Sequence, residues 1–200
     1  MMHWTYRHWY QVGMIFALAI AVFLAIHYQE IDPFKIILLL SLITLFLHQF
    51  EEYQWPGGFP QMVNAVMFKS PQPRRYPLNP RTAFIINVGL GWSAYLLAFI
   101  FASSAVWLAV ATIVVSLGNF FAHTFLFNLK GHSYYNPGMA TAALLFLPLT
   151  IYFFIFGIQH GLFTTTNLLV GILLGAALNY FGVIKLITLL AKKSPDREYV

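Results

Sequence analysis

The chain has 200 residues, of which 60% are hydrophobic and only 8% are charged, whereas roughly 25% of the residues in an average soluble domain are charged. So few charges do not cover a soluble protein of this length, which excludes an ordinary soluble domain. The net charge of +5 does not indicate a nucleic-acid partner, because the basic residues lie at the ends of apolar runs. The absence of cysteine excludes disulfides and thiol chemistry.

The apolar runs predict an all-α protein, a polytopic membrane helix bundle of about six transmembrane helices that forms a single domain over residues 1–200. The apolar part of the second helix stops at Leu47. To cross a hydrocarbon core about 30 Å thick, this helix must continue through Glu51 and Glu52. The six helices are expected over residues 10–28, 34–52, 82–101, 104–127, 137–157 and 166–190.

Three polar segments join or follow these helices. Residues 54–80 are rich in proline and glycine and are expected to form the one substantial extramembrane loop, with a short interfacial helix over residues 63–68. Residues 128–136 form a short connection, and Asn136 is predicted to be the N-cap of a fifth helix that begins at Pro137. Residues 191–200 form a polar tail.

The distribution of lysine and arginine predicts the orientation. With six crossings, both termini, the long loop and the 128–136 connection share one side of the membrane, and this side carries nearly all the basic residues. The positive-inside rule therefore predicts that both termini are cytoplasmic. We expect the chain to lie among the lipids of the cytoplasmic membrane of a bacterium.

Ionisable residues form a stripe on the second predicted helix. His48, Glu51 and Glu52 lie at relative positions i, i+3 and i+4, so their side chains share one face. Ser41 and Thr44 extend that face into the membrane. A charged side chain in a membrane helix costs roughly 2.5–3.5 kcal/mol at the bilayer centre, which favours a partner or a function for it.

The fourth predicted helix carries a second polar stripe. Thr112, Ser116, Asn119 and His123 recur at intervals of four, three and four residues. The topology brings His123 to the same depth as the ionisable residues of the second helix. Two independent stripes that reach one level predict a shared site.

The residue types of this site favour a metal ion. His48 and Glu52 lie about 6 Å apart along the helix axis and are expected to bind one divalent ion together. His123 or His132 completes a His/Glu/His set typical of zinc or non-haem iron.

The remaining polar groups are assigned to catalysis under this hypothesis. Glu51 is left as the general base, and Asn128 or Asn136 stabilises a developing oxyanion. A structural alternative remains open, in which Glu51 and Glu52 pair with arginine side chains and the histidines form only local hydrogen bonds. The basic residues considered for that pairing are Arg74, Arg75 and Arg81.

A family resemblance rests on two segments of the sequence. His48-Gln49-Phe50-Glu51-Glu52, followed by Tyr53 and by Pro56-Gly57-Gly58-Phe59-Pro60, resembles the HXXEE-motif family of small integral membrane proteins, whose function is not established. The resemblance implies a membrane location and an importance of the motif, and it implies no reaction. The similarity to prenyl-protein-processing intramembrane proteases is weaker, because Pro56 occupies the position of their arginine.

Three functions follow as hypotheses. The leading one is a metal-dependent membrane hydrolase that acts on a lipid or another hydrophobic small molecule entering from the cytoplasmic leaflet. The second is a proton- or cation-coupled transporter, which needs a polar path past Ser41 and Thr44 to the far side. The third is a metal-free protein, either a glutamate-type intramembrane protease or a non-catalytic structural membrane protein.

Overall fold

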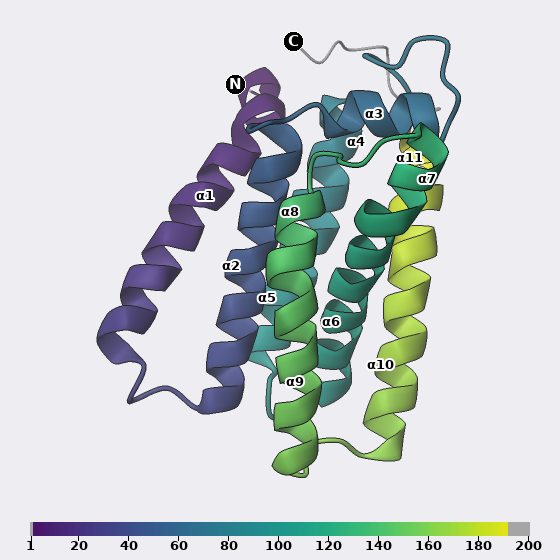
Figure 1. Cartoon of the computed structure of the whole chain (residues 1–200). Helices are drawn as coiled ribbons and strands as arrows, with labels where there is room; N and C mark the ends of the chain where they lie inside the picture. The colour runs from purple at the N-terminus through teal and green to yellow at the C-terminus, as the bar shows by residue number, and fades with distance from the viewer. Residues whose placement is uncertain (1, 192–200) are drawn as a thin grey trace.

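The computed structural model describes residues 2–191, with side chains from residue 4 onward, and this part of the chain is a bundle of long helices without strands (Figure 1). Six helices are long and apolar enough to cross a membrane, which confirms the predicted all-α membrane architecture. The spans are Trp4–His27, Pro33–Tyr53, Pro80–Ile100, Val106–Gly131, Met139–Gln159 and Thr165–Ala191.

The first two spans are the single helices α1 (Met2–His27) and α2 (Pro33–Tyr53), and a short helix, α3 (Phe59–Val66), lies across one end of the bundle (Figure 1). The other four spans are each built from three segments. The third span comprises α4 (Pro80–Phe84), η1 (Ile85–Trp92) and α5 (Ser93–Ile100), and the fourth comprises α6 (Val106–Phe121), η2 (Ala122–Leu126) and α7 (Phe127–Gly131). The fifth comprises α8 (Met139–Thr141), η3 (Ala142–Phe146) and α9 (Leu147–Gln159), and the sixth comprises α10 (Thr165–Ala177), η4 (Leu178–Lys185) and α11 (Leu186–Ala191).

The η segments are π-helical and interrupt the third to sixth spans near the same end of the bundle. π-helical turns are rare and occur frequently at functional sites, because an extra residue in the turn changes the direction of the side chains that follow. Three of these segments carry a polar side chain in the apolar span, namely Asn87, His123 and Asn179.

Local sequence explains several helix starts. Asp32 caps α2 by accepting a hydrogen bond from the Lys35 backbone N–H (3.1 Å), and Pro33 occupies the first turn. Asn79 caps α4 in the same way, and Pro80 follows it. Thr164 caps α10.

Two predicted helix starts are wrong. The first helix begins at Met2 rather than at residue 10, because no helix breaker precedes the apolar run and Trp9 is buried against Tyr53. The interfacial helix covers Phe59–Val66 rather than residues 63–68, because Gly58 adopts a positive φ of 87° and Pro60 fits the first turn that follows it.

The connection between the fourth and fifth spans also differs from the prediction. The fourth span continues to Gly131, so Asn128 lies in a helix rather than in the connection. The fifth span begins at Met139 rather than at Pro137, and its N-cap residue is Gly138. Asn136 therefore does not cap this helix. Its side chain is turned toward the fourth span, where it bonds to His123 and Asn128.

A seam of small residues joins the fourth and sixth spans. A Cβ atom added to Gly171 would meet Val110, and one added to Gly175 would meet Val114, so glycine allows the two backbones to approach closely. Asn179 donates a hydrogen bond across this seam to the Val114 carbonyl (3.1 Å).

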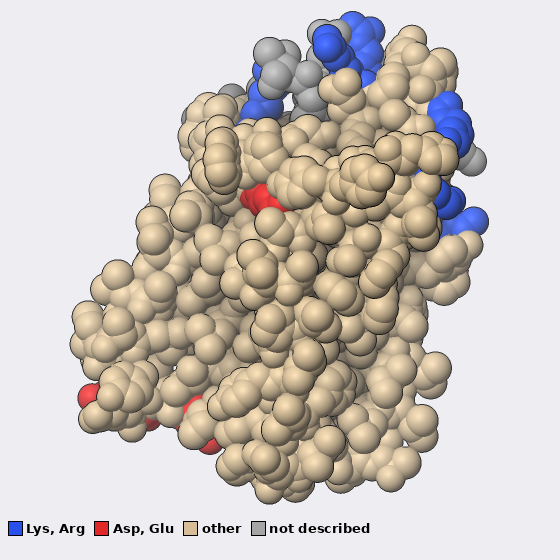
Figure 2. All heavy atoms as spheres, viewed as in Figure 1, with Lys and Arg blue, Asp and Glu red and all other residues tan. Residues whose placement is uncertain are grey.

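Both ends of the described chain, α3 and residues 132–138 lie at one end of the bundle, here called the loop side (Figure 1). The turns at residues 28–32, 101–105 and 160–164 lie at the opposite end, the far side. Lysine and arginine gather at the loop side (Figure 2). The described basic residues of this side beyond the first span include Lys69, Arg74, Arg75, Arg81 and Lys130.

Candidate metal centre

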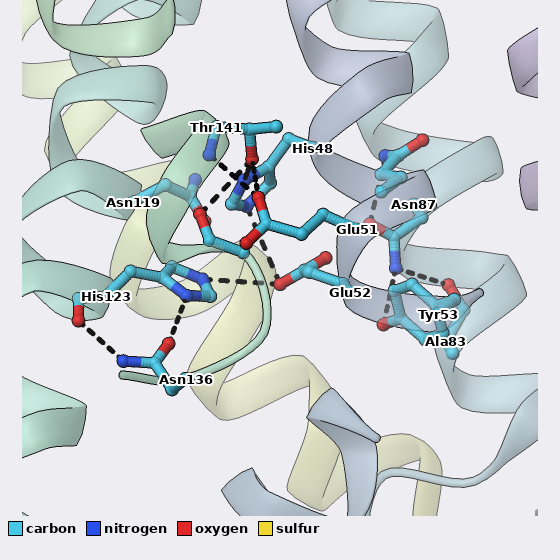
Figure 3. Close-up of polar contacts among 12 residues, drawn as sticks. His48, Glu51, Glu52, Tyr53, Ala83, Asn87, Asn119, His123, Asn136 and Thr141 are labelled. Atoms are coloured by element: carbon cyan, nitrogen blue, oxygen red, sulfur yellow. Dashed lines mark hydrogen bonds and ion pairs between the residues drawn. The ribbon is translucent and has the colours of Figure 1, made fainter. Parts of the chain in front are cut away.

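Three ionisable side chains converge inside the loop-side half of the bundle. His48 and Glu52 come from the last turns of α2, and His123 comes from η2 (Figure 3). Glu52 Oε1 lies 3.6 Å from His48 Nε2 and 3.3 Å from His123 Nε2. All three side chains are buried, with exposed fractions of 2% for His48, 4% for Glu52 and 0% for His123.

The hydrogen bonds around His123 determine which of its ring nitrogens carries the proton. Asn136 Nδ2 donates to the His123 carbonyl (2.7 Å) and to Asn128 Oδ1 (2.8 Å), which orients the Asn136 amide. Its Oδ1 therefore faces His123 Nδ1 at 2.7 Å, and an amide oxygen only accepts. His123 is thus protonated on Nδ1, and its Nε2 lone pair points toward Glu52.

A different set of partners gives His48 the same tautomer. Thr141 Oγ1 donates its one hydrogen to Glu51 Oε2 (2.5 Å), because a carboxylate only accepts. The Thr141 oxygen therefore accepts from His48 Nδ1 at 2.9 Å. The Nε2 atom of His48 is left with a lone pair, as a metal ligand requires.

With both histidines protonated on Nδ1, two ring nitrogens present their lone pairs to one carboxylate oxygen, in an arrangement of three side chains here called the cage. Neither His48 Nε2 nor His123 Nε2 has a hydrogen-bond partner, although both atoms are buried. Buried nitrogens without a partner are costly, and the three ligand atoms repel one another unless a proton or a metal cation lies among them. The ligand atoms all lie within 4.8 Å of one another. Zinc–ligand bonds of about 2.0–2.1 Å in a tetrahedron separate neighbouring ligands by roughly 3.4 Å, close to the two distances to Glu52.

Glu51 makes a separate set of contacts on the same face of α2. Its carboxylate accepts hydrogen bonds from the backbone N–H groups of Ala140 (3.1 Å) and Thr141 (2.7 Å), from the Thr141 hydroxyl and from the Tyr135 hydroxyl (2.8 Å). The N–H groups belong to the first turn of the fifth span, where a helix favours a negative charge. Glu51 therefore caps this span from another helix, in the place expected for Asn136.

The Tyr135 hydroxyl, which donates to Glu51, lies just outside the membrane spans. Burial, together with the hydrogen bond to Glu51, raises the pKa of Tyr135 to about 12. The phenol therefore stays protonated over the physiological range and donates to the carboxylate.

The walls of the cage are backbone and aromatic rings. Gly138 has a φ of 99°, and a Cβ atom at this position would collide with His123 and would lie 2.9 Å from His48 Cε1. Phe59 of α3 stacks on His123, with ring centroids 5.1 Å apart, and Phe146 contacts His48 at 4.7 Å. Only glycine fits at residue 138 without displacing the histidines.

The structure brings some of the predicted site residues together and separates others. His48, Glu52 and His123 form the cage. His132 is exposed at the end of α7 with a φ of 51° and lies outside the group. Asn128 and Asn136 lie beside His123. The Asn136 amide donates one hydrogen to the His123 carbonyl and the other to Asn128 Oδ1, so neither is free to stabilise an oxyanion.

The structural alternative pairs the two glutamates with arginine. Among the described residues, Glu52 Oε1 contacts the Nε2 atoms of His48 and His123. The hydrogen-bond partners of Glu51 are those of the fifth-span start and Tyr135. Neither pattern is the predicted pairing with arginine side chains.

The sequence alone does not identify Thr141, which bonds to His48, or Gly138, which lies against both histidines. Thr141 stands alone in an apolar run, so periodicity does not identify it. The one available signal is the Asn136-Pro137-Gly138 turn, which marks a helix start and hence a group of free N–H donors able to receive an anion.

The comparisons with known proteins give a family and no further relative. A family model described as "Protein of unknown function with HXXEE motif" matches residues 39–153, a range that contains all three cage residues. No curated protein and no solved structure matches the chain.

Proposed function

The chain belongs to the HXXEE family, and from the site that its motif forms we propose a membrane-embedded, metal-dependent hydrolase that acts on a lipidic substrate. His48, Glu52 and His123 are the proposed ligands of one divalent ion, zinc or iron. The observation that carries the proposal is the orientation of the two buried histidines, whose Nε2 lone pairs face one carboxylate oxygen with no hydrogen-bond partner.

The roles of the surrounding residues follow from their hydrogen bonds. When bound, the ion supplies a Lewis acid and lowers the pKa of a water molecule at an open position. Asn136 holds His123 in the required tautomer, and Glu51 holds His48 through Thr141. Because four donors already occupy the Glu51 carboxylate, we assign it a positioning role instead of the general-base role expected from the sequence.

The surroundings of the cage support a hydrophobic substrate. His48 and Glu52 line a cavity of about 450 Å³ whose other walls are mainly apolar side chains. This volume lies within the range of about 300–1,000 Å³ typical of small-molecule sites. A hydrolase needs such a space beside the ion, and a purely structural ion site does not.

The packing of the far-side half argues against a transporter. Ser41 is buried, and the Thr44 hydroxyl donates to the Ser41 carbonyl (2.8 Å), so this polar stripe turns back on its own helix. Between the stripe and the far side lies an apolar cluster that includes Phe34, Ile113 and Phe153. A proton or cation path needs polar groups or water at that level.

The test is the metal content of the detergent-purified protein, measured by elemental mass spectrometry. We expect about one zinc or iron per wild-type chain and a loss of that metal in His48→Ala, Glu52→Ala and His123→Ala, because each removes one of three ligands. His132→Ala is the matched control, since it removes a histidine outside the cage, and it should retain the metal.

Two results would contradict the proposal. Metal absent from a monodisperse, helical wild-type protein after growth in zinc and iron would favour the metal-free glutamate-type protease. Equal loss of metal in His132→Ala would show that the exposed histidine, and not the cage, dominates binding. Size-exclusion profiles and far-ultraviolet circular dichroism separate loss of metal from loss of fold.

A further inference from the structure

The cavity beside the cage extends from the metal ligands toward the middle of the bundle. Its floor is formed in part by Tyr95 and Thr112. The Tyr95 hydroxyl lies 2.9 Å from the Thr112 carbonyl and 2.7 Å from Ser116 Oγ, so its polar atom already has partners. The inner end of the cavity therefore suits a hydrocarbon chain rather than a polar group.

The cavity reaches the surface of the bundle between the fourth and sixth spans. Gly118 of the fourth span packs directly against Asn179 of the sixth span, so the two spans are in close contact there. On the loop side of this contact, three lining residues are exposed, namely Phe121 (53%), Leu126 (36%) and Ile184 (40%). All three lie in membrane spans, so the opening faces lipid rather than water.

The charged side chains that line the cavity restrict which polar group the ligand can carry. No lysine or arginine is among the lining residues that the structure describes, and the one acidic side chain there is Glu52, a proposed metal ligand. The other polar groups include the neutral amides of Gln49, Asn87 and Asn119. A phosphate or free carboxylate would find no cationic side chain in this space to balance its charge, whereas a neutral ester or amide needs none.

We propose that the cavity binds one hydrocarbon chain of a neutral single-chain lipid, which enters laterally between the fourth and sixth spans with its ester or amide directed toward the cage. This inference rests on the proposed function for its orientation, and it names the substrate class. A volume of about 450 Å³ suits one chain, because a second chain of equal length would need about twice the space.

The test is photo-crosslinking of the protein in lipid nanodiscs with a monoacylglycerol that carries a diazirine within its chain. Crosslinked peptides are mapped by mass spectrometry. We expect crosslinks at cavity residues such as Leu90, Ala94 and Val115, in addition to outward-facing residues that contact bulk lipid.

Two glycines of η1 provide a blocking variant and a matched control. Gly91 lines the cavity, and a Cβ atom there meets no atom closer than 3.7 Å, so Gly91→Leu fills the cavity without a backbone collision. Gly89 is exposed two residues earlier, and a Cβ atom there meets nothing within 4 Å. Gly91→Leu should lose the cavity crosslinks, and Gly89→Leu should retain them.

Competition defines the class of ligand. Unlabelled monoacylglycerol should abolish the cavity crosslinks, while a free fatty acid and a two-chain phosphatidylcholine at the same concentration should not. Crosslinks confined to outward-facing residues, or unchanged in Gly91→Leu, would overturn the cavity site. Equal competition by the fatty acid or by the phospholipid would overturn the neutral single-chain assignment.

A ligand variant separates this inference from the proposed function. In His123→Ala the metal should be lost while the cavity crosslinks remain, because His123 is a proposed metal ligand but does not line the cavity. Cavity crosslinks in a wild-type protein that holds no metal would contradict the proposed metal-dependent hydrolase and support the lipid site. Bound metal without cavity crosslinks would support the metal centre and contradict the proposed substrate class.

Discussion

At the residue scale, two histidines present the same nitrogen to one carboxylate although different partners hold them. An asparagine amide fixes His123, and a threonine hydroxyl backed by a carboxylate fixes His48. Both arrangements protonate Nδ1 and free Nε2. Partners of this kind decide whether the histidines bind an ion, because a rotated ring or the other tautomer would place a hydrogen inside the cage.

Gly138 lets the backbone pass against both rings, so Gly138→Ala is expected to open the cage. The added Cβ atom collides with His123 and approaches His48 Cε1, and a φ of 99° disfavours alanine. We expect loss of the bound metal and a free energy of unfolding lowered by roughly 1–3 kcal/mol. Metal stoichiometry and thermal unfolding in detergent measure these effects.

Gly58→Ala is the control for backbone strain. Gly58 has a similar φ of 87°, and a Cβ atom there meets nothing within 4 Å. This variant should lose some stability and keep its metal. Loss of metal in both variants to the same degree would attribute the effect to strain rather than to contact with the histidines.

At the scale of the helices, Glu51 joins the end of α2 to the start of the fifth span. Its carboxylate receives the two N–H groups that the first turn of α8 leaves unpaired. The same turn supplies Thr141, which orients His48. The start of the fifth span and the geometry of the cage are therefore coupled through one side chain.

Glu51→Gln is expected to weaken metal binding rather than only stop turnover. The glutamine amide brings an NH₂ group to a position where four donors converge, so at least one donor is left without an acceptor. Loss of such outer partners typically costs about 10–100-fold in metal affinity. Competition titration with a zinc chelator measures this change.

Tyr135→Phe is the milder companion of that variant. It removes one donor and leaves the two backbone N–H groups and the Thr141 hydroxyl on the carboxylate, so metal affinity should change little. If Glu51→Gln kept full affinity but lost hydrolytic activity, Glu51 would be the general base and not a positioning residue.

The sequence predicts the helices better than it predicts their contacts. Apolar runs set the six spans because the bilayer thickness fixes their length, and helical spacing places His48 and Glu52 on one face. The local pattern predicts Asn136 as the N-cap of the fifth span, but the Glu51 carboxylate, from a distant helix, takes that role. Such contacts between distant segments leave no local signal.

The π-helical segments set a second limit on sequence reasoning. Their extra residue changes which side chains share a face, so a period of 3.6 residues does not carry through η2 or η3. His123 was nevertheless placed at the correct depth, because depth depends on span length and topology. Its ring orientation depends on Asn136 and was not predictable.

At the scale of the whole molecule, charge separates the two ends of the bundle. The loop side carries the described basic residues of the long loop and Lys130, whereas the far-side turn before α2 holds Glu30 and Asp32 beside Lys35. Figure 2 shows the basic groups at the loop side, and acidic groups at the far side and at one place in the loop-side half. The metal cage lies in the loop-side half, so orientation decides which compartment it faces.

The positive-inside rule predicts that the loop side is cytoplasmic, and the absence of cysteine makes this directly testable. Gln72→Cys lies in the long loop and Gln29→Cys in a far-side turn, and both glutamines are exposed. In intact bacterial cells, a membrane-impermeant maleimide should label the cysteine at residue 29 and leave that at residue 72 unlabelled, whereas permeabilised cells should label both. The reverse pattern would place the cage toward the outer compartment, and a lipid would then reach the opening between the fourth and sixth spans from the outer leaflet.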